Sequence, residues 1–146
     1  MPSDTPDLLA LENQVCFALA VASRSVNAVY RPLLEPLGLT HPQYLVMLAL
    51  WEKSPRSVRE LGEELRLDPA TLSPLLKRLE AAGLVTRARS VADDRALDIE
   101  LTADGRALRS KAEAVPGTIV QKLGMPVTDL EDMRDALSRL IAAATR

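Results

Sequence analysis

Apolar residues recur at every third or fourth position along much of this chain. In the first such stretch, residues 8–30, the apolar positions are Leu8, Leu11, Val15, Leu19, Val26 and Val29. This spacing predicts a long amphipathic helix. Pro32, Pro36 and Gly38 interrupt the pattern, so Arg31–Leu37 is expected to form no more than a short helical piece.

Two later segments begin with a capping box, in which Ser or Thr is followed three residues on by Glu or Gln. Thr40 and Gln43 form the first box, ahead of the almost wholly apolar segment Tyr44–Trp51. We expect that segment to be a central buried helix. Ser57 and Glu60 form the second box, which predicts the start of a short helix.

A further helix is predicted to begin at Asp68. Asp68 is a good N-cap, and Pro69 needs no amide donor at the first helical position. Pro74 lies inside this helix, where it removes a hydrogen bond, so a start at Ser73-Pro74 is also open. The earlier start with a tolerated kink is preferred. Gly83 suits the left-handed position that ends a helix.

The pattern then changes from a period of three or four to a period of two. Strands are predicted at Leu84–Arg89 and Leu97–Leu101, joined by a charged loop. In the second strand Leu97, Ile99 and Leu101 alternate with acids, which indicates one buried face. These two strands are therefore expected to form a hairpin.

Two more helices are predicted after the hairpin. Thr102 caps one that runs to about Val115, where Pro116-Gly117 interrupts it. The last covers about Thr128–Ala144 and carries an apolar stripe. The residues of that stripe are Leu130, Met133, Leu137, Leu140 and Ile141.

The order over Ser57–Leu101 is helix, tight turn, helix, strand, charged loop and strand, which is the order of a winged helix-turn-helix. The expected fold class is mainly α with a small β-hairpin wing, flanked by N- and C-terminal dimerisation helices. The N-terminal dimerisation helices are expected in residues 1–36, the winged helix-turn-helix in 37–114 and the C-terminal dimerisation helices in 115–146. Apolar stripes on the outer helices indicate an interface. A two-fold homodimer would bury them and place two recognition helices about 34 Å apart.

Length and composition exclude several other classes. At 146 residues the chain is expected to be one compact domain, or one domain with helical extensions. No apolar run reaches the ~18 residues that cross a membrane, and no signal-peptide pattern opens the chain. We therefore expect a cytoplasmic protein without a membrane partner. One Cys allows no intramolecular disulfide, and one His offers no metal cluster, so no cofactor is expected.

The net charge of −2 is unevenly distributed. Residues 1–55 carry three cations against five acids, whereas residues 69–90 carry four cations against Glu80 alone. The second segment is where phosphate contacts would be needed. Charge therefore argues only against indiscriminate binding of nucleic acid.

The helix from Asp68 and the hairpin after it carry the candidate contacts to double-stranded DNA. Short hydroxyls on the helix would lie near bases, and cations would lie on phosphates or guanine edges. At the tip of the wing Arg95 would reach the minor groove, with Asp93 or Asp94 orienting its guanidinium. The alternative is an ordinary solvated face, but helix and wing together favour DNA. The residues assigned to DNA are Thr71, Ser73, Lys77, Arg78, Arg87, Arg89, Asp94 and Arg95.

Cys16 lies between Val15 and Phe17 on the first helix. Free cysteine is among the most buried residue types, so an inert core residue is the favoured interpretation of this position by itself. Tyr30 is fourteen residues later, about 21 Å further along a helix. The two residues would meet only across a dimer with antiparallel helices. His41 either starts a helix or donates a hydrogen bond to a thiolate.

Several segments resemble the MarR family and, within it, the organic-hydroperoxide-sensing repressors of the OhrR type, one-cysteine subtype. They are LENQVCF (residues 11–17), YRPLLEPLGLTHPQYL (30–45), LDPATLSPLLKRLE (67–80) and DDR (93–95). The last is common to MarR proteins, whereas the surroundings of Cys16 and Tyr30 are specific to the peroxide sensors. The resemblance covers nearly all of the chain and favours a sensor role for Cys16.

The resemblance implies a homodimeric repressor with a pseudo-palindromic operator, and not an enzyme. It implies that an organic hydroperoxide oxidises Cys16 to a sulfenic acid, with Tyr30 and His41 supporting the thiol, in part from the other subunit. His41 and Ala20 stand where relatives commonly have tyrosine, so the hydrogen-bond network is altered. Because there is no second cysteine, release from DNA would need a small thiol or over-oxidation.

Two other functions are open. In one, a MarR-type repressor responds to a small anionic or phenolic ligand and Cys16 is structural. In the other, Cys16 is the centre of a thiol peroxidase. The second is disfavoured because the chain has no resolving cysteine and no arginine is evident beside Cys16.

Overall fold

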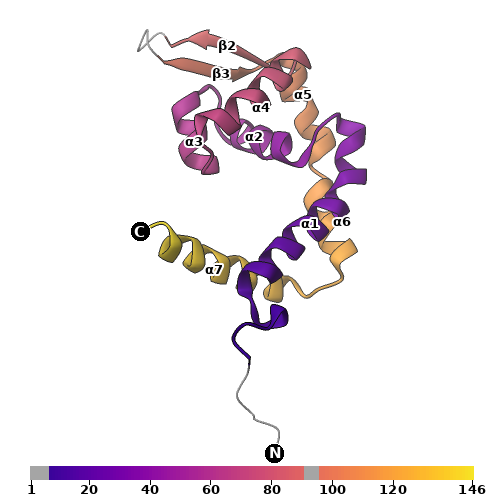
Figure 1. The fold of residues 1–146 in the computed structure, drawn as a ribbon. Coiled ribbons are helices and arrows are strands. Elements are labelled where there is room, and N and C mark those ends of the chain that lie inside the picture. The colour runs from indigo at the N-terminus through magenta and orange to yellow at the C-terminus, as the bar shows by residue number, and fades with distance from the viewer. Residues whose placement is uncertain (1–6, 91–95) are drawn as a thin grey trace, which may run out of the picture. The chain divides into compact units, whose positions relative to one another are not determined.

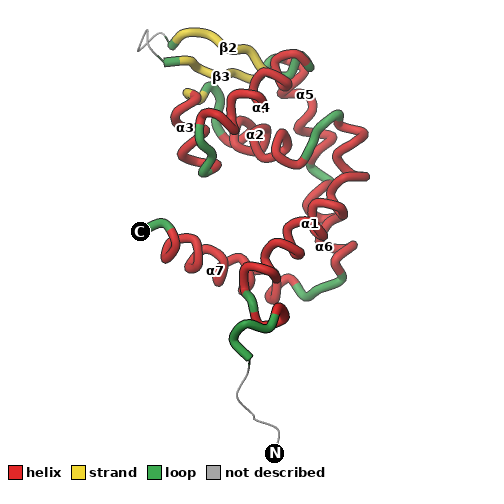
Figure 2. The backbone as a smooth tube through the Cα atoms, in the orientation of Figure 1, coloured by secondary structure: helices red, strands yellow, loops and turns green. Residues whose placement is uncertain are grey.

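The structure, a computed structural model, describes residues 7–90 and 96–146. It divides into two compact units, Met1–Ala112 and Glu113–Arg146. Figure 1 shows the helices and strands, and Figure 2 shows that the chain is mainly helical, with β2 and β3 side by side. In chain order they are α1 (Val15–Leu34), α2 (His41–Glu52), β1 (Arg56–Ser57), α3 (Val58–Leu65), α4 (Pro69–Ala81), β2 (Val85–Arg89), β3 (Leu97–Leu101), α5 (Ala103–Ala112), α6 (Val115–Leu123) and α7 (Val127–Ala144).

The first helix begins later than the sequence pattern predicts. α1 starts at Val15, and only a single 3-10 turn, Leu11–Asn13, precedes it. The side chains of Asn13 and Gln14 explain the difference. The Asn13 amide donates to the Asp7 carbonyl and the Gln14 amide to the Leu8 carbonyl, both at 2.6 Å. These bonds occupy carbonyls that a continuous helix would use, so the chain turns before α1.

The same helix ends later than predicted, because it continues through Pro32 to Leu34. Pro32 has no amide to donate to the carbonyl of Ala28. Both residues are exposed, so water can take the place of the missing donor. A 3-10 turn at Glu35–Leu37 then leads to Gly38, whose φ of 71° is left-handed. The short helical piece expected at Arg31–Leu37 is therefore partly the end of α1.

α2 is the central helix of the first unit, as predicted. Its capping box is confirmed, since the Thr40 hydroxyl accepts from the Gln43 amide and the Gln43 side chain accepts from the Thr40 amide. Val46 and Met47 are completely buried, whereas Leu45 and Leu48 remain partly exposed. The helix is therefore apolar on every side but covered on only part of its surface.

The hairpin is confirmed and is part of a larger sheet than predicted. Among the described residues the sheet is antiparallel with the order β1-β3-β2, and β1 pairs Arg56 with Ile99. Two-residue β1 was not predicted, since so short a strand has no periodicity. Ile99 is fully buried, but Leu97 is 42% exposed because it lies towards the loop end of the hairpin. The prediction that Leu97 is buried is wrong.

α5 packs closely against β3 and against Leu84, the residue before β2. The Thr102 hydroxyl accepts from the Gly105 amide at 3.0 Å, which confirms the predicted cap. A Cβ at Gly105 would overlap the backbone carbonyl of Leu84, so only glycine fits there. The Trp51 indole donates to the Gly105 carbonyl at 2.9 Å. Gly105 thus joins α2, the sheet and α5.

The second unit consists of α6 and α7. α6 was not predicted, because Pro116-Gly117 was interpreted as a break. Pro116 instead lies in the first turn of α6, where its missing amide costs nothing, and α5 already ends at Ala112. α7 covers Val127–Ala144, close to the predicted 128–144, and Met133, Leu140 and Ile141 are exposed on it. Within the described ranges no helix is long and apolar enough to cross a membrane.

Candidate functional site

α3 and α4 form a helix-turn-helix whose turn is set by its own backbone. The Ser57 hydroxyl accepts from the Glu60 amide at the start of α3. α3 ends at Arg66, which has a left-handed φ of 55°, and the Leu67 amide donates back to the Gly62 carbonyl at 2.9 Å. Asp68 then starts α4 by accepting from the Thr71 amide at 2.7 Å. This bond, with one from the Thr71 side chain, holds the pKa of Asp68 below its ordinary value.

α4 starts after Asp68, so the alternative start at Ser73 is excluded and Pro74 lies inside the helix. The carbonyl that Pro74 leaves without a donor is that of Ala70. Both residues are exposed, as are Pro32 and Ala28 in α1. In each helix the proline faces water, where the loss of one hydrogen bond is tolerated.

The candidate DNA contacts on α4 share one exposed face. Thr71, Lys77 and Arg78 are exposed, and Ser73 is half-buried at the edge of the face. No ion pair or hydrogen bond engages the side chains of Lys77 and Arg78 among the described residues. On the opposite face the helix buries Leu72, Leu75, Leu76 and Leu79. The helix is thus anchored by leucines and presents two unpaired cations.

The end of α4 directs the chain into β2. Gly83 has a φ of 78°, its amide donates to the Glu80 carbonyl, and the Leu84 amide donates to the Leu79 carbonyl at 3.0 Å. This pair of bonds is the Schellman motif. It confirms the predicted role of Gly83, which ends α4 and leads the chain directly into β2.

The two arginines predicted on β2 have different environments. The Arg87 guanidinium donates twice to Glu80 Oε1, at 3.2 Å from Nε and 3.0 Å from Nη2. The side-chain hydrogen bond from Arg87 holds the pKa of Glu80 below its ordinary value. Arg89 is exposed and has no partner among the described residues. Asp94 and Arg95, assigned to the wing tip together with Asp93, lie outside the described residues.

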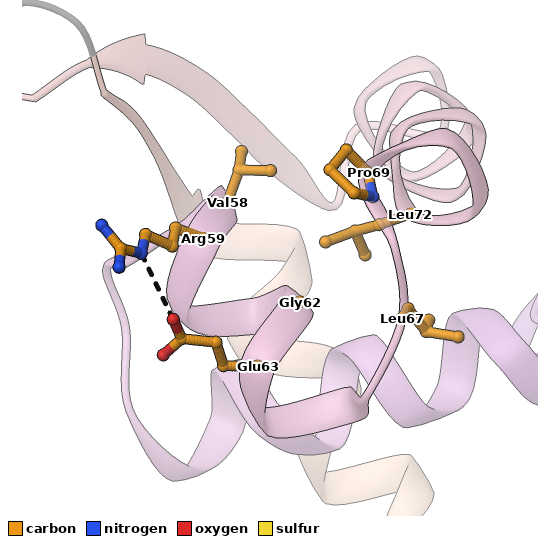
Figure 3. Close-up of a pocket in the computed structure, with 7 residues that line it drawn as sticks. All are labelled: Val58, Arg59, Gly62, Glu63, Leu67, Pro69 and Leu72. Atoms are coloured by element: carbon orange, nitrogen blue, oxygen red, sulfur yellow. Dashed lines mark hydrogen bonds and ion pairs between the residues drawn. The ribbon is translucent and has the colours of Figure 1, made fainter. Parts of the chain in front are cut away.

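A pocket of about 380 Å³ lies between α3 and α4 (Figure 3). Its wall is mostly apolar, and at its edge Arg59 pairs with Glu63 at 3.2 Å. A Cβ on Gly62 would stand 3.0 Å from the Leu67 carbonyl, so the bare backbone keeps the two helices close. The lining residues are Val58, Arg59, Gly62, Glu63, Leu67, Pro69 and Leu72.

Cys16 is the second residue of α1 and is exposed. It is not the buried core residue that its type favours. Its neighbours Val15 and Phe17 are also exposed, at 63% and 41%. Tyr30 lies on the same helix, so the separation of about 21 Å along a straight helix holds. Within one chain the Tyr30 side chain therefore does not reach the Cys16 thiol.

Tyr30 instead packs with His41 and Tyr44, and we call these three residues the aromatic cluster. The ring centroids of Tyr30 and His41 are 4.8 Å apart in an edge-on arrangement, and those of Tyr30 and Tyr44 are 5.9 Å apart. Burial raises the pKa of both tyrosines and lowers that of His41. Among the described residues neither tyrosine hydroxyl has a hydrogen-bond partner. Tyr30 is half-buried, whereas Tyr44 is only 3% exposed, so Tyr30 is the more accessible of the two to a group from outside the chain.

A second pocket, of about 370 Å³, adjoins the aromatic cluster. Arg31 and Asn27 provide polar groups from α1, and His41 belongs to both the cluster and the pocket wall. The lining residues are Asn27, Arg31, Leu34, Glu35, Leu39, Thr40, His41 and Pro42. The wall thus combines apolar residues with the guanidinium of Arg31 and the carboxylate of Glu35, a mixture that suits a small amphipathic ligand.

The structure therefore brings the predicted residues into two separate groups. Thr71, Lys77, Arg78 and Arg89 belong to one exposed module, and Tyr30 and His41 belong to the aromatic cluster; Cys16 lies apart from both. Two contributors were missed. The charge pattern singles out Glu80 as the only acid among the cations of residues 69–90 but does not reveal its pairing with Arg87. Tyr44 follows His41 by three residues on one helix face. In the part of the chain that the structure describes, no group of residues could hold a metal ion.

Comparison with known proteins gives a consistent result. The sequence pattern of the MarR family matches residues 39–97. The organic hydroperoxide resistance transcriptional regulator of Bacillus subtilis (strain 168) is 46% identical over 135 residues, which are 92% of this chain and 92% of that protein.

Solved structures of similar proteins agree with the sequence comparison. Reduced AbfR bound to DNA has a TM-score of 0.73 and 35% identity, covering 90% of this chain and 96% of that one. AbfR is a protein of Staphylococcus epidermidis, and its overoxidized form bound to DNA matches with a TM-score of 0.71, 36% identity, and coverage of 89% and 94%. CouR of Rhodococcus jostii RHA1 bound to p-coumaroyl-CoA has a TM-score of 0.77 and 29% identity, covering 90% and 94%.

Proposed function

Because this chain belongs to the MarR family, we propose that it is a dimeric, DNA-binding transcriptional repressor that organic hydroperoxides release from its operator by oxidising Cys16. One observation carries the proposal. The lone cysteine is exposed on α1, in a chain 46% identical to a regulator of organic hydroperoxide resistance. A reactive thiol has to be accessible to its oxidant.

For DNA, the proposal assigns α4 to the major groove and the hairpin to the flanking backbone or minor groove. The exposed, unpaired cations Lys77 and Arg78 support it, since such groups can bind phosphate without first breaking an internal ion pair. Arg89 is assigned in the same way, and Arg95 with Asp94 remains the predicted wing tip. AbfR, of similar sequence and fold, has been solved bound to DNA.

For assembly, the proposal assigns dimerisation to the N-terminal helices of residues 1–36 and the C-terminal helices of residues 115–146, with the winged helix-turn-helix over 37–114. Large apolar side chains outside the core support this assignment. Leu8 is 79% exposed, Leu9 91% and Val15 63% in the single chain. A two-fold dimer would bury them and would select a pseudo-palindromic operator in double-stranded DNA.

For sensing, the Cys16 thiolate would attack the outer oxygen of the hydroperoxide. The O–O bond breaks, the alcohol leaves after taking up a proton, and Cys16 becomes a sulfenic acid. Tyr30 would reach this sulfur only from the partner chain, because it lies about 21 Å away along its own helix. Its place between His41 and Tyr44 supports a fixed orientation for its hydroxyl.

Release from DNA would follow when a small thiol attacks the sulfenic acid, giving a mixed disulfide and water. The chain has no second cysteine to do this. Over-oxidation is the other route. A relative, AbfR, has been solved overoxidized and still bound to DNA, so we assign release to the mixed disulfide.

The test uses a DNA fragment selected from random sequence by the reduced protein. We expect cumene hydroperoxide plus a small thiol to release the wild-type protein and to leave Cys16→Ser bound. The matched control is Ser23→Cys on α1, combined with Cys16→Ser, which restores a thiol to the helix but at an exposed position about two turns away. Release of Cys16→Ser by the same treatment would exclude Cys16 as the sensor.

A second candidate is a repressor controlled by a small anionic or phenolic ligand. The 370 Å³ pocket beside His41, with Arg31 in its wall, favours it, and CouR has been solved with p-coumaroyl-CoA bound. Calorimetric titration of Cys16→Ser with aromatic carboxylates distinguishes the two. Binding that also releases DNA from this variant would support the ligand mechanism, because no thiol is then present.

A further inference from the structure

Arg87 and Arg89 lie on the same face of β2 but differ in their hydrogen-bond partners. Residues two apart on a strand point to the same side, so Arg87 and Arg89 share a face with buried Val85. The Arg87 side chain is 28% exposed and tied to Glu80 by two hydrogen bonds. Arg89 is exposed and has no partner among the described residues. Arg87 is therefore already paired within the chain, whereas Arg89 can bind a group from outside it.

The pair of Arg87 with Glu80 joins β2 to α4, two elements that would bind DNA together. Glu80 lies in the last turn of α4, and Arg87 lies in the middle of β2, where it pairs with fully buried Ile99 on β3. At this corner the turn at Gly83 is also tied to Thr102, whose hydroxyl donates to the Gly83 carbonyl at 2.6 Å and whose amide donates to the Leu84 carbonyl at 3.0 Å. These links all lie at the base of the hairpin, where Val85 pairs with Leu101. A second link at some distance from the turn would fix the angle.

We propose that the Glu80–Arg87 ion pair is a positioning device that holds the wing at a fixed angle to α4, and that Arg89, not Arg87, is the phosphate contact of β2. The proposal rests on the DNA binding proposed above. Glu80 is then required near DNA despite its charge, because without it the Arg87 guanidinium would turn outward and the hairpin would lose its link to α4. The lowered pKa of Glu80 agrees with a carboxylate that stays ionised in this pair.

The direction in which Glu80→Gln changes the affinity for DNA distinguishes two possible roles of Glu80. If Glu80 were only an acid near DNA, removing its charge would strengthen binding. If it positions the wing, removal weakens binding in spite of the favourable change in charge. Exposed ion pairs couple weakly, and a dimer has two copies, so we expect roughly a three- to tenfold loss of affinity. Arg87→Gln should give a similar loss, and the double variant no further loss, since all three break one link.

The salt dependence of binding separates Arg87 from Arg89. Each neutralised phosphate contributes about 0.9 to the slope of log K against log salt, so one residue in both protomers contributes about 1.8. Arg89→Gln should lower the slope by about this amount. Arg87→Gln, at matched charge and on the same strand face, should lower affinity and leave the slope nearly unchanged.

The experiment is a fluorescence anisotropy titration of the selected DNA at several salt concentrations with wild type and these variants. Glu80→Arg combined with Arg87→Glu serves as the rescue, and we expect it to recover affinity lost in either single variant. Tighter binding by Glu80→Gln, unchanged affinity, or a slope loss in Arg87→Gln equal to that in Arg89→Gln would overturn the proposal.

A measurement without DNA keeps the two proposals apart. Failure of the wild-type protein to bind any DNA would contradict the proposed function. In the free protein, hydrogen exchange of the β2 amides should be faster in Glu80→Gln and Arg87→Gln than in wild type, and unchanged in Arg89→Gln. Equal exchange in all four proteins would exclude the positioning role whatever the DNA result.

Discussion

Replacing Lys77 with Gln should weaken DNA binding by an amount that depends on salt in a calculable way. Lys77 is exposed on α4 and unpaired among the described residues, so it gives up no internal partner when it meets a phosphate. One phosphate contact in each protomer of the proposed dimer corresponds to a slope loss of about 1.8. Between 50 and 200 mM salt, a fourfold change, the ratio of wild-type to variant affinity should then fall by about 12-fold.

The assay is an anisotropy titration at those two salt concentrations, with Lys111→Gln as the control. Lys111 is also exposed, but it lies near the end of α5, about 12 Å along that helix from its start beside β3. Both variants lose the same charge, so only a local contact distinguishes them. If Lys77→Gln and Lys111→Gln showed the same slope, the assignment of the exposed α4 face to phosphates would be refuted.

Three further predictions concern the scaffold that supports this face. Leu72→Ala should lower the free energy of unfolding by about 2–5 kcal/mol, because Leu72 is completely buried behind the exposed face of α4. A urea titration followed by the fluorescence of the single tryptophan tests this. A loss below about 1 kcal/mol would contradict the packing. Gly105→Ala should be strongly destabilising because its Cβ would overlap the Leu84 carbonyl, whereas Gly117→Ala, with nothing within 4 Å, should gain about 0.5–1 kcal/mol in the same assay. Burial lowers the pKa of His41 below its ordinary 6.5, so between that lowered value and 6.5 the unfolded chain binds more protons than the fold. Its stabilising contribution is complete above pH 6.5 and is lost as the pH falls towards the folded pKa, so wild type should lose more stability than His41→Gln between pH 7.5 and 5, and parallel losses would contradict the buried neutral imidazole.

Much of the first unit could be predicted because its helix boundaries are local chemistry. Thr40, Ser57, Asp68 and Thr102 each cap the helix expected of them, and Gly83 ends α4 in a left-handed conformation. A cap needs only a side chain and an amide two or three residues away. The sequence displays both partners side by side.

The ends of α1 could not be predicted in the same way. Its apolar pattern starts at Leu8, but Asn13 and Gln14 take carbonyls from the preceding turn and delay the helix. At the other end Pro32 is tolerated because it faces water. Whether a proline faces solvent or core is a property of tertiary structure. The presence of Pro32 in the sequence therefore could not show whether the helix ends there or continues with a kink.

The candidate site could be predicted in its composition but not in its connections. Lys77, Arg78 and Arg89 are available as expected, yet Arg87 is already paired with a carboxylate seven residues away on another element. That pairing depends on the angle between α4 and β2, which periodicity does not determine. Cys16 was expected in the core by residue type, and it is exposed because the start of α1 finds no cover within one chain.

The proposed function requires that oxidation of Cys16 releases the protein from DNA. The most direct test measures both quantities in one sample, by intact mass spectrometry for the state of Cys16 and by anisotropy for the DNA-bound fraction, after addition of cumene hydroperoxide with and without a small thiol. We expect the released fraction to follow the fraction of Cys16 that carries the mixed disulfide. Release while Cys16 remains reduced, or complete conversion to the mixed disulfide with the DNA still bound, would contradict it.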